Sequence, residues 1–180
     1  MSRLLEKYKS EIVPHLLKEH NYKNVMAVPR IEKVVVSMGV GKTLENKNRL
    51  EAAVRDLAAI TGQKPVVTKA RNSVAGFKLR KGQEIGCKVT LRGKIMYEFL
   101  DRLINLAIPR IRDFRGLPRT AFDKKGNYNF GISEQVVFPE ISIDKLEFVQ
   151  GMNITMCISA KKKEDTLGLL ERIGIPFRSR

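Results

Sequence analysis

The order of the apolar segments is the feature that most constrains the fold, because strand-like and helix-like patterns follow one another without a regular repeat. Alternating or β-branched apolar runs, which are typical of strands, occupy residues 31–37, 65–68, 87–91 and 153–159, with shorter extended pieces at 128–133 and 135–138. Apolar residues three and four positions apart, which are typical of helices, occupy residues 3–19, 50–60, 95–106 and 164–173. We therefore expect an α+β fold with a mostly antiparallel sheet, helices packed on one face and a long basic inter-strand loop.

Proline and glycine indicate where these elements end. Pro14 should kink or end the first helix, Gly62 should terminate the second, and Pro109 should close or bend the third. A length of 180 residues suits one domain. We expect this domain to span residues 1–180 and to include the N-terminal helix 3–19.

The segment VVVSMGVGKT, Val34–Thr43, raises the question of nucleotide binding, because an apolar run leads into a glycine-rich turn that ends in GKT. A phosphate-binding P-loop requires GxxxxGK[ST], which would place its first glycine at position 36. Val36 occupies that position, and no later apolar strand ends in an Asp that could hold Mg²⁺. The pattern favours a tight strand-to-helix turn whose glycines permit positive φ, rather than a nucleotide hydrolase.

Positive charge is the main signal in the composition. The chain has 34 Lys and Arg against 19 Asp and Glu, which gives a net charge of +15. Residues 61–120 carry +10 of this excess, and Glu84 is the only acid between Asp56 and Glu98. A surface that serves only solubility normally mixes both signs. We therefore expect a polyanionic partner, with nucleic acid as the leading class.

Metal, cofactor and membrane functions find little support in the sequence. Cys87 and Cys157 lie in apolar runs without metal-binding spacing, so we expect two buried free thiols, no metal and no cofactor. His15 and His20 are five positions apart, and we expect both at the surface without a catalytic partner. No apolar run approaches the roughly 18 residues of a membrane span, and no signal-peptide core is visible. A cytoplasmic protein without enzymatic activity is the expectation.

Residues 69–83, KARNSVAGFKLRKGQ, combine cationic, neutral hydrogen-bonding and aromatic side chains. Irregular or single-stranded RNA requires all three, because phosphates bind cations, sugars and base edges form hydrogen bonds, and unstacked bases lie on aromatic rings. Gly76 and Gly82 would let the chain turn at both ends of the tip. The side chains are the cations Lys69, Arg71, Lys78, Arg80 and Lys81, the neutral Asn72 and Ser73, and the aromatic Phe77.

Several long segments resemble one known family in the same order along the chain. The run LAAITGQKPVVTKARNSVAGFKLRKGQEIGCKVTLRG, Leu57–Gly93, resembles the signature region of the bacterial large-subunit ribosomal protein five family. The resemblance covers essentially the whole chain. The other similar segments are NYKNVMAVPRIEKVVVSMGVG, PRIRDFRGL, GNYNFGISEQVVFPEI and IPFR.

The resemblance implies a structural protein of the ribosome. Members of this family bind 5S ribosomal RNA and large-subunit ribosomal RNA in the central protuberance. They also contact P-site transfer RNA through an extended loop and form a bridge to a small-subunit protein. In this chain the loop corresponds to Val74, Ala75, Gly76, Phe77, Lys78, Leu79, Arg80, Lys81 and Gly82.

The resemblance also suggests individual RNA-binding residues. Gln63, Phe77 and Thr90 match family positions implicated in recognition of 5S RNA, and Ser37 stands where the family commonly has Asn. Ser37 keeps a hydroxyl group and loses the amide. Together with the charge pattern, this predicts phosphate contacts, stacking and neutral hydrogen bonds from Ser37, Gln63, Lys69, Arg71, Asn72, Ser73, Phe77, Lys78, Arg80, Lys81, Lys88, Thr90 and Arg92.

Three alternatives remain open at this stage. Val74, Phe77 and Leu79 could fold back into the core and leave only a solvated basic edge. A nucleotide hydrolase would depend on Lys42. A general nucleic-acid chaperone would share the basic loop but would bind any structured RNA equally well.

Overall fold

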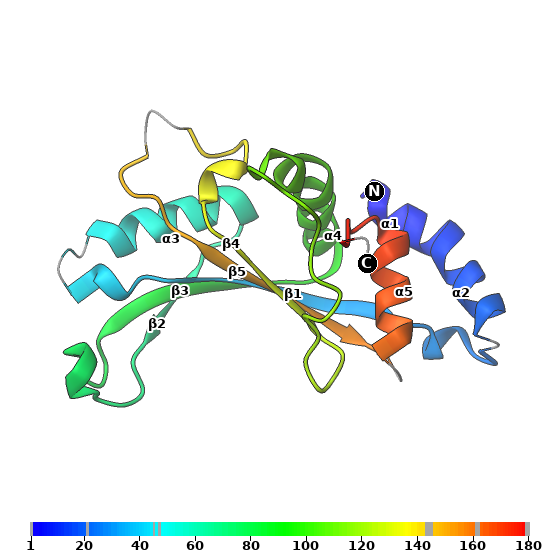
Figure 1. The fold of residues 1–180 in the computed structure, drawn as a ribbon, viewed down its shortest axis with the longest axis horizontal. Coiled ribbons are helices and arrows are strands. Elements are labelled where there is room, and N and C mark those ends of the chain that lie inside the picture. The colour runs from blue at the N-terminus through cyan, green and yellow to red at the C-terminus, as the bar shows by residue number, and fades with distance from the viewer. Residues whose placement is uncertain are drawn as a thin grey trace. The chain divides into compact units, whose positions relative to one another are not determined.

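Figure 1 shows the fold as a computed structural model of the chain. The structure describes residues 2–20, 22–44, 46, 48–142, 146–160 and 163–178; for Lys42, Leu44 and Lys163 it describes the backbone only.

Five strands form one sheet in the order β2-β3-β1-β5-β4, which confirms the predicted α+β class. Strand β2 pairs antiparallel with β3, so these two consecutive strands form a hairpin that carries the basic loop at its end. Strand β3 begins three residues before the predicted Cys87, which lengthens this hairpin toward the loop. The strands are β1 Arg30–Gly39, β2 Val66–Lys69, β3 Glu84–Leu91, β4 Tyr128–Ile132 and β5 Met152–Ser159.

The four predicted helical segments lie near their predicted positions, and the short 3₁₀ turns η2, η3, η4 and η7 were not predicted. Helix α3 ends where Gly62 adopts a φ of 68° and its N–H donates to the Ala58 carbonyl, as expected for a C-terminal glycine. Gly174, with a φ of 107°, ends α5 in the same way. The helices are α1 Arg3–Lys7, η1 Tyr8–Ile12, α2 Val13–Glu19, η2 Val25–Ala27, η3 Gly41–Leu44, α3 Asn48–Thr61, η4 Ala75–Phe77, α4 Gly93–Arg102, η5 Leu103–Ala107, η6 Ile108–Arg110, η7 Gln135–Val137 and α5 Lys163–Ile173.

A π-helical turn precedes both Pro14 and Pro109; the helix continues beyond Pro14 to Glu19, whereas the helical run around Pro109 ends at Arg110, as predicted. Residues 8–12 form such a turn before Pro14, and the N–H of Val13 donates to the Tyr8 carbonyl five residues back. Residues 103–107 form the second, before Pro109. A proline ring clashes with the carbonyl four residues earlier in a regular α-helix, and the wider π turn relieves that clash.

One short element was predicted wrongly. Residues 135–138 were expected to be extended, but Gln135–Val137 form a 3₁₀ turn, closed by a hydrogen bond from the Phe138 N–H to the Gln135 carbonyl. Gln135 is the polar residue of this otherwise apolar run, and its side chain is fully buried. It therefore contacts groups inside the protein and does not face solvent.

The chain groups into two compact units. The first unit contains residues 1–34, 91–130 and 155–180, and the second contains residues 35–90 and 131–154. Both units contain parts of β1, β3, β4 and β5, so the sheet runs through both. The expectation of a single domain over residues 1–180 stays a prediction.

Two buried tyrosines in the first unit predict a loss of stability at alkaline pH. Burial raises the pKa of Tyr97 to about 12 and that of Tyr128 to about 12. Unfolded tyrosines ionise near pH 10, so between about pH 10 and 12 the unfolded state loses protons that the folded state keeps. Stability should therefore be complete below pH 10 and should fall as the pH rises toward 12.

The measurement is the melting temperature at pH 9, 10 and 11 for the wild type and for Tyr97→Phe. Phenylalanine cannot ionise, so the decline with pH should be shallower in the variant. Parallel declines in the two proteins would show that Tyr97 does not contribute to the pH dependence. Lysine titration affects both proteins equally and cancels in this comparison.

Candidate nucleic-acid interface

The basic loop, residues 70–83, is an ordered extension of the β2–β3 hairpin. The Ala70 N–H donates to the Gln83 carbonyl at 2.8 Å, and the Gly82 N–H donates to the Ala70 carbonyl at 3.0 Å. Two side chains also bind the backbone across the loop: the Ser73 hydroxyl accepts from the Lys81 N–H, and the Gln83 side-chain carbonyl accepts from the Arg80 N–H. The loop can therefore present its exposed groups in a fixed arrangement.

The tip of this loop is a small turn that one pair of residues closes. Val74 and Leu79 form an antiparallel bridge with hydrogen bonds of 2.9 and 3.1 Å. Between them, Ala75–Phe77 make a 3₁₀ turn, and Lys78 follows in the left-handed conformation with a φ of 53°. Gly76 lies within this turn and Gly82 has a positive φ of 89°, so both glycines lie where the chain turns, as predicted; Lys78 is a left-handed residue that the sequence did not indicate.

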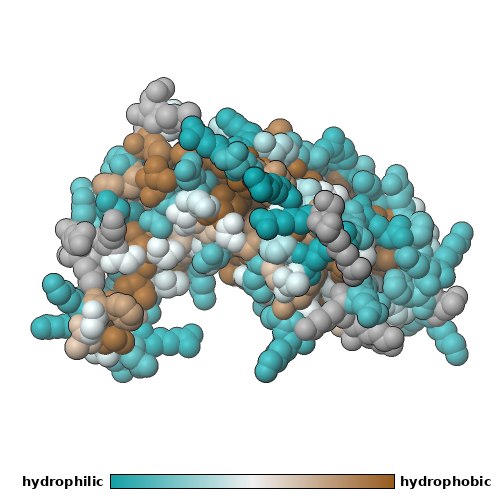
Figure 2. Space-filling view, viewed as in Figure 1, coloured by the Kyte–Doolittle hydropathy of each residue, from teal (hydrophilic) through white to brown (hydrophobic). Residues whose placement is uncertain are grey.

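The apolar side chains of the tip do not return to the core. Phe77 is 76% exposed and Val74 is 41% exposed, while Leu79 is half-buried. Figure 2 shows apolar and hydrophilic side chains side by side at this projecting end of the molecule. An exposed ring of this size is unusual unless it contacts a partner. The alternative in which Val74, Phe77 and Leu79 all fold back into the core is therefore wrong.

The cations of the basic loop and of the strand residue before it, Lys69, differ in their availability. The ammonium of Lys69, the last residue of β2, lies 3.6 Å from the carboxylate of Glu84. Both side chains are more than half exposed, and such a surface ion pair is weak enough for a phosphate to replace the carboxylate. The other cations have no ion-pair partner among the residues that the structure describes: Arg71, Lys78, Arg80 and Lys81.

Within the second unit, the sheet presents a polar face next to this loop. Burial alternates along β3, where Lys88 is exposed and Thr90 is half-buried while Cys87, Val89 and Leu91 face the core. Ser37 occupies a half-buried position in β1, whose neighbours Val36 and Met38 are buried. The predicted sites on these strands therefore fall at positions that do not face the core.

Two residues of this polar face were missed in the sequence. Thr68 pairs with Gly86 in the register of β2 and β3, and Asn153 is exposed on β5 between the buried Met152 and Ile154. The alternation in NITMCIS marks Asn153 as outward-facing, and this was the signal that could have identified it. Gln63 is exposed just after α3. Arg92 is exposed in the first unit, at the N-cap of α4.

The MGVG turn does not have the geometry of a phosphate loop. The Thr43 hydroxyl, which would face a metal ion in a P-loop, donates to the Glu84 carbonyl at 2.9 Å and is buried. Gly39 and Gly41 do not have positive φ, so the expectation of left-handed glycines here was wrong. Space around both positions is open, which still permits a close approach of RNA to the backbone. The side chain of Lys42 lies outside the described part of the chain.

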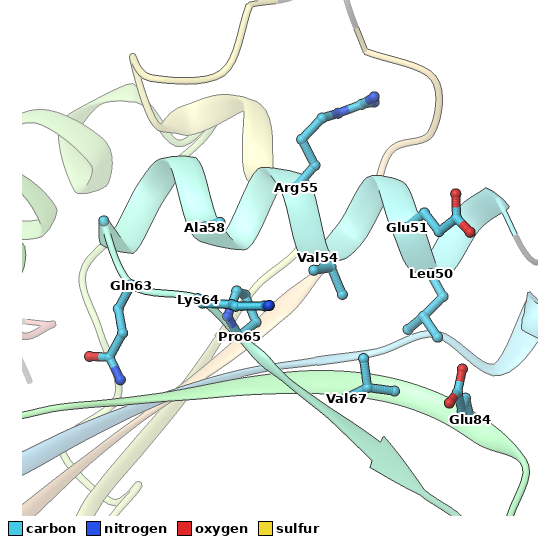
Figure 3. Close-up of a pocket in the computed structure, with 11 residues that line it drawn as sticks. Leu50, Glu51, Val54, Arg55, Ala58, Gln63, Lys64, Pro65, Val67 and Glu84 are labelled. Atoms are coloured by element: carbon cyan, nitrogen blue, oxygen red, sulfur yellow. The ribbon is translucent and has the colours of Figure 1, made fainter.

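A groove lies between α3 and the segment that enters β2 (Figure 3). Leu50, Val54 and Pro65 give it a mainly apolar wall, and Gln63 and Lys64 stand at one end. Among the residues that the structure describes, no Ser, Cys or His lines this groove, and its charged lining residues are Glu51, Arg55, Lys64 and Glu84.

The structure adds a partner for one histidine and corrects one prediction about the thiols. His20 is exposed, as predicted, but it has an acidic partner: its Nδ1 lies 3.4 Å from the Asp165 carboxylate, which also accepts a 2.6 Å hydrogen bond from the Tyr22 hydroxyl. These residues connect α2 to the start of α5. Cys87 is buried and burial raises its pKa to about 11, but Cys157 is only half-buried because it lies at an outward position of β5.

Comparison with known proteins identifies the family. Residues 24–80 match the family model described as Ribosomal protein L5, and residues 84–177 match the model of the ribosomal L5P family C-terminus. The chain belongs to the ribosomal protein L5 family. This confirms the family assignment made from the signature segments.

Full-length relatives support the same conclusion. The chain is 54% identical over 178 residues to the large ribosomal subunit protein uL5 of Syntrophomonas wolfei, which covers 99% of this chain and 100% of the relative. It is 56% identical over 178 residues to uL5 of Geobacter sulfurreducens, at 99% coverage of both chains. These relatives are ribosomal proteins and not enzymes, in agreement with the expectation of a non-enzymatic function. No helix among the described residues is long and apolar enough to cross a membrane.

Proposed function

We propose that this chain is a structural protein of the large ribosomal subunit, acts in the cytoplasm, and binds 5S ribosomal RNA and large-subunit ribosomal RNA in the central protuberance. The observation that carries the proposal is the exposed tip of the basic loop, where Phe77 stands among unpaired cations on a chain that matches its relatives over 99% of its length. Unstacked bases and phosphates are the groups that such a tip fits.

The two parts of the interface would have different roles. The exposed cations Arg71, Lys78 and Arg80 would bind phosphates and supply affinity. The polar sheet face, with Ser37 and Thr90, would supply hydrogen bonds to sugars and base edges. Lys88 would add a phosphate contact, and Gln63 and Asn72 would add hydrogen bonds. Lys69 would release the Glu84 carboxylate and bind a phosphate in its place.

The tip would also contact P-site transfer RNA in the assembled ribosome. Residues Val74–Gly82 project beyond the sheet and are held by the bridge between Val74 and Leu79, so the tip can reach a second RNA while the sheet holds the first. A bridge to a small-subunit protein completes the proposed set of partners. The family resemblance supports this bridge without assigning residues to it.

The test measures affinity for the cognate 5S RNA and for a scrambled structured RNA of equal length across a salt series. The double variant Arg71→Ala/Lys78→Ala should reduce the salt slope by about 1.4 to 1.8, because each lost phosphate contact removes roughly 0.7 to 0.9. Phe77→Ala should weaken binding by about 1–3 kcal/mol through lost stacking, at an unchanged melting temperature.

A matched control is the double variant Arg3→Ala/Arg55→Ala. It removes the same charge from exposed side chains that already pair with Asp101 and Glu147. An unchanged salt slope in the loop variant would contradict the assignment of the phosphate contacts. Equal binding of both RNAs by the wild type would instead indicate a non-specific RNA chaperone.

A further inference from the structure

Most of the excess positive charge lies outside the basic loop. The first unit has 22 basic and 11 acidic residues, a net charge of +11, whereas the second unit, which contains the basic loop, has 12 and 8, a net charge of +4. A charge excess of this size repels itself unless a polyanion lies nearby. The first unit therefore needs an explanation that the basic loop does not provide.

One segment of the first unit concentrates arginine. Residues 110–119, the arginine loop, begin at the last residue of η6 and contain Asp113 as their single acid. Asp113 adopts the left-handed conformation with a φ of 51°, and its side chain is exposed. The exposed arginines of the loop are Arg110, Arg112, Arg115 and Arg119.

The arginine loop is held in place by the C-terminal segment. The Leu117 N–H donates to the Pro176 carbonyl at 2.8 Å, and the Arg178 N–H donates to the Leu117 carbonyl at 3.0 Å. The Arg178 side chain adds a 3.0 Å hydrogen bond to the Gly116 carbonyl. Leu117 is itself buried. Since the backbone is already fixed, a ligand would not need to order it on binding.

One of the four arginines in the loop contacts other parts of the protein, and the other three have no ion-pair partner among the described residues. Arg119 pairs with Glu171 at 3.0 Å and lies over the ring of Phe177. Arg110, Arg112 and Arg115 have no ion-pair partner in the part of the chain that the structure describes. Two exposed arginines elsewhere, Arg3 and Arg55, do have carboxylate partners. Three exposed guanidinium groups without an ion-pair partner among the described residues thus lie within six consecutive residues.

The chemistry of the arginine loop differs from that of the basic loop. Residues 109–116 contain no Asn, Gln, Ser or Thr, and their one ring, Phe114, is half-buried. The loop thus offers charge without exposed stacking surfaces or neutral hydrogen-bonding side chains. A planar guanidinium binds phosphate oxygens in a bidentate manner, and duplex RNA presents phosphates while hiding its bases.

We propose that Arg110, Arg112 and Arg115 form a second RNA-binding surface that contacts the phosphate backbone of double-stranded RNA without regard to sequence. This inference rests on the proposed ribosomal function and adds a second point of attachment, on the first unit. The protein would then hold irregular RNA through the basic loop and an RNA helix through the arginine loop.

The experiment measures binding of the full-length protein to a labelled 20-base-pair RNA duplex of arbitrary sequence, and to 5S RNA, across a salt series. The variant Arg112→Gln/Arg115→Gln should bind the duplex at least tenfold more weakly near 0.1 M salt, with a salt slope lower by roughly 1.4 to 1.8. The control Arg3→Gln/Arg55→Gln should lose at most threefold. Melting temperatures should be unchanged, because the altered side chains are exposed.

A third variant, Arg71→Gln/Lys78→Gln, separates this inference from the proposed function. It should lower affinity for 5S RNA and leave duplex binding nearly intact. Equal duplex affinity in the arginine-loop variant and its control would overturn the inference, and so would a larger loss of duplex binding in the basic-loop variant. Competition by poly-aspartate as strong as that by unlabelled duplex would also overturn it, in favour of an acidic protein partner. If duplex binding depends on the arginine loop but 5S RNA shows no preference over scrambled RNA, the proposed function fails and this inference stands.

Discussion

Replacing Gln135 by leucine is expected to lower the free energy of unfolding by about 3 kcal/mol, because it leaves buried polar groups without partners. Gln135 is fully buried in the second unit. Its side-chain NH₂ donates to the Phe148 carbonyl at 2.7 Å and to the Asp56 carboxylate at 3.3 Å, and its side-chain carbonyl accepts from the Gln150 N–H at 2.6 Å. Leucine fills a similar volume but satisfies none of these groups.

Urea unfolding of Gln135→Leu measures this effect, with Gln63→Leu as the matched control. Gln63 is exposed, so the same change there should alter stability by no more than about 0.5 kcal/mol. If both variants unfold at the same urea concentration as the wild type, the connection from Gln135 to residues 148 and 150 does not stabilise the fold.

Replacing Gly86 by alanine is expected to cost about 2–4 kcal/mol, since the added methyl group would collide with the neighbouring strand. A Cβ atom at this position would lie 2.4 Å from the backbone carbonyl oxygen of Met38 in β1 and 3.2 Å from the Thr68 hydroxyl in β2. The carbonyl belongs to a paired strand and cannot rotate away, so the strands must separate. Overpacking of this kind costs roughly 1–3 kcal/mol in typical cores, and more where backbone must move.

Thermal unfolding tests this prediction, and the control variant is expected to change stability in the opposite direction. Gly86→Ala should lower the melting temperature by roughly 4–16 °C for a protein of this size, at about 2–4 °C per kcal/mol. Gly168 lies within α5, where a Cβ would meet nothing within 4 Å, so Gly168→Ala should raise stability by up to about 1 kcal/mol. An unchanged melting temperature in Gly86→Ala would mean that β1 and β3 are not as closely paired as the short distance to the Met38 carbonyl indicates.

The effect at Gly86 should extend to RNA binding. Gly86 precedes Lys88 and Thr90 on the same face of β3, so separation of the strands would displace the predicted contacts on that face. Gly168→Ala changes none of these positions. Loss of RNA affinity in folded Gly86→Ala, but not in Gly168→Ala, would connect the close spacing of β1 and β3 to the interface.

Local patterns in the sequence determined the α+β class and the positions of the five strands and the four long helical segments. Apolar periodicity depends on neighbours within one or two turns, and Gly62 and Gly174 ended their helices through their own backbone freedom. The signature segments around Leu57–Gly93 and beyond determined the family, because long motifs in a fixed order do not require a structure to be recognised.

Only the tertiary structure decided which groups are available for binding and which are used internally. The strand order β2-β3-β1-β5-β4, the pairing of Lys69 with Glu84 and the burial of Gln135 all depend on the approach of distant segments. The attachment of the arginine loop to residues 176–178 has the same origin. Such contacts form between residues far apart in the chain, and periodicity within a single segment contains no information about them.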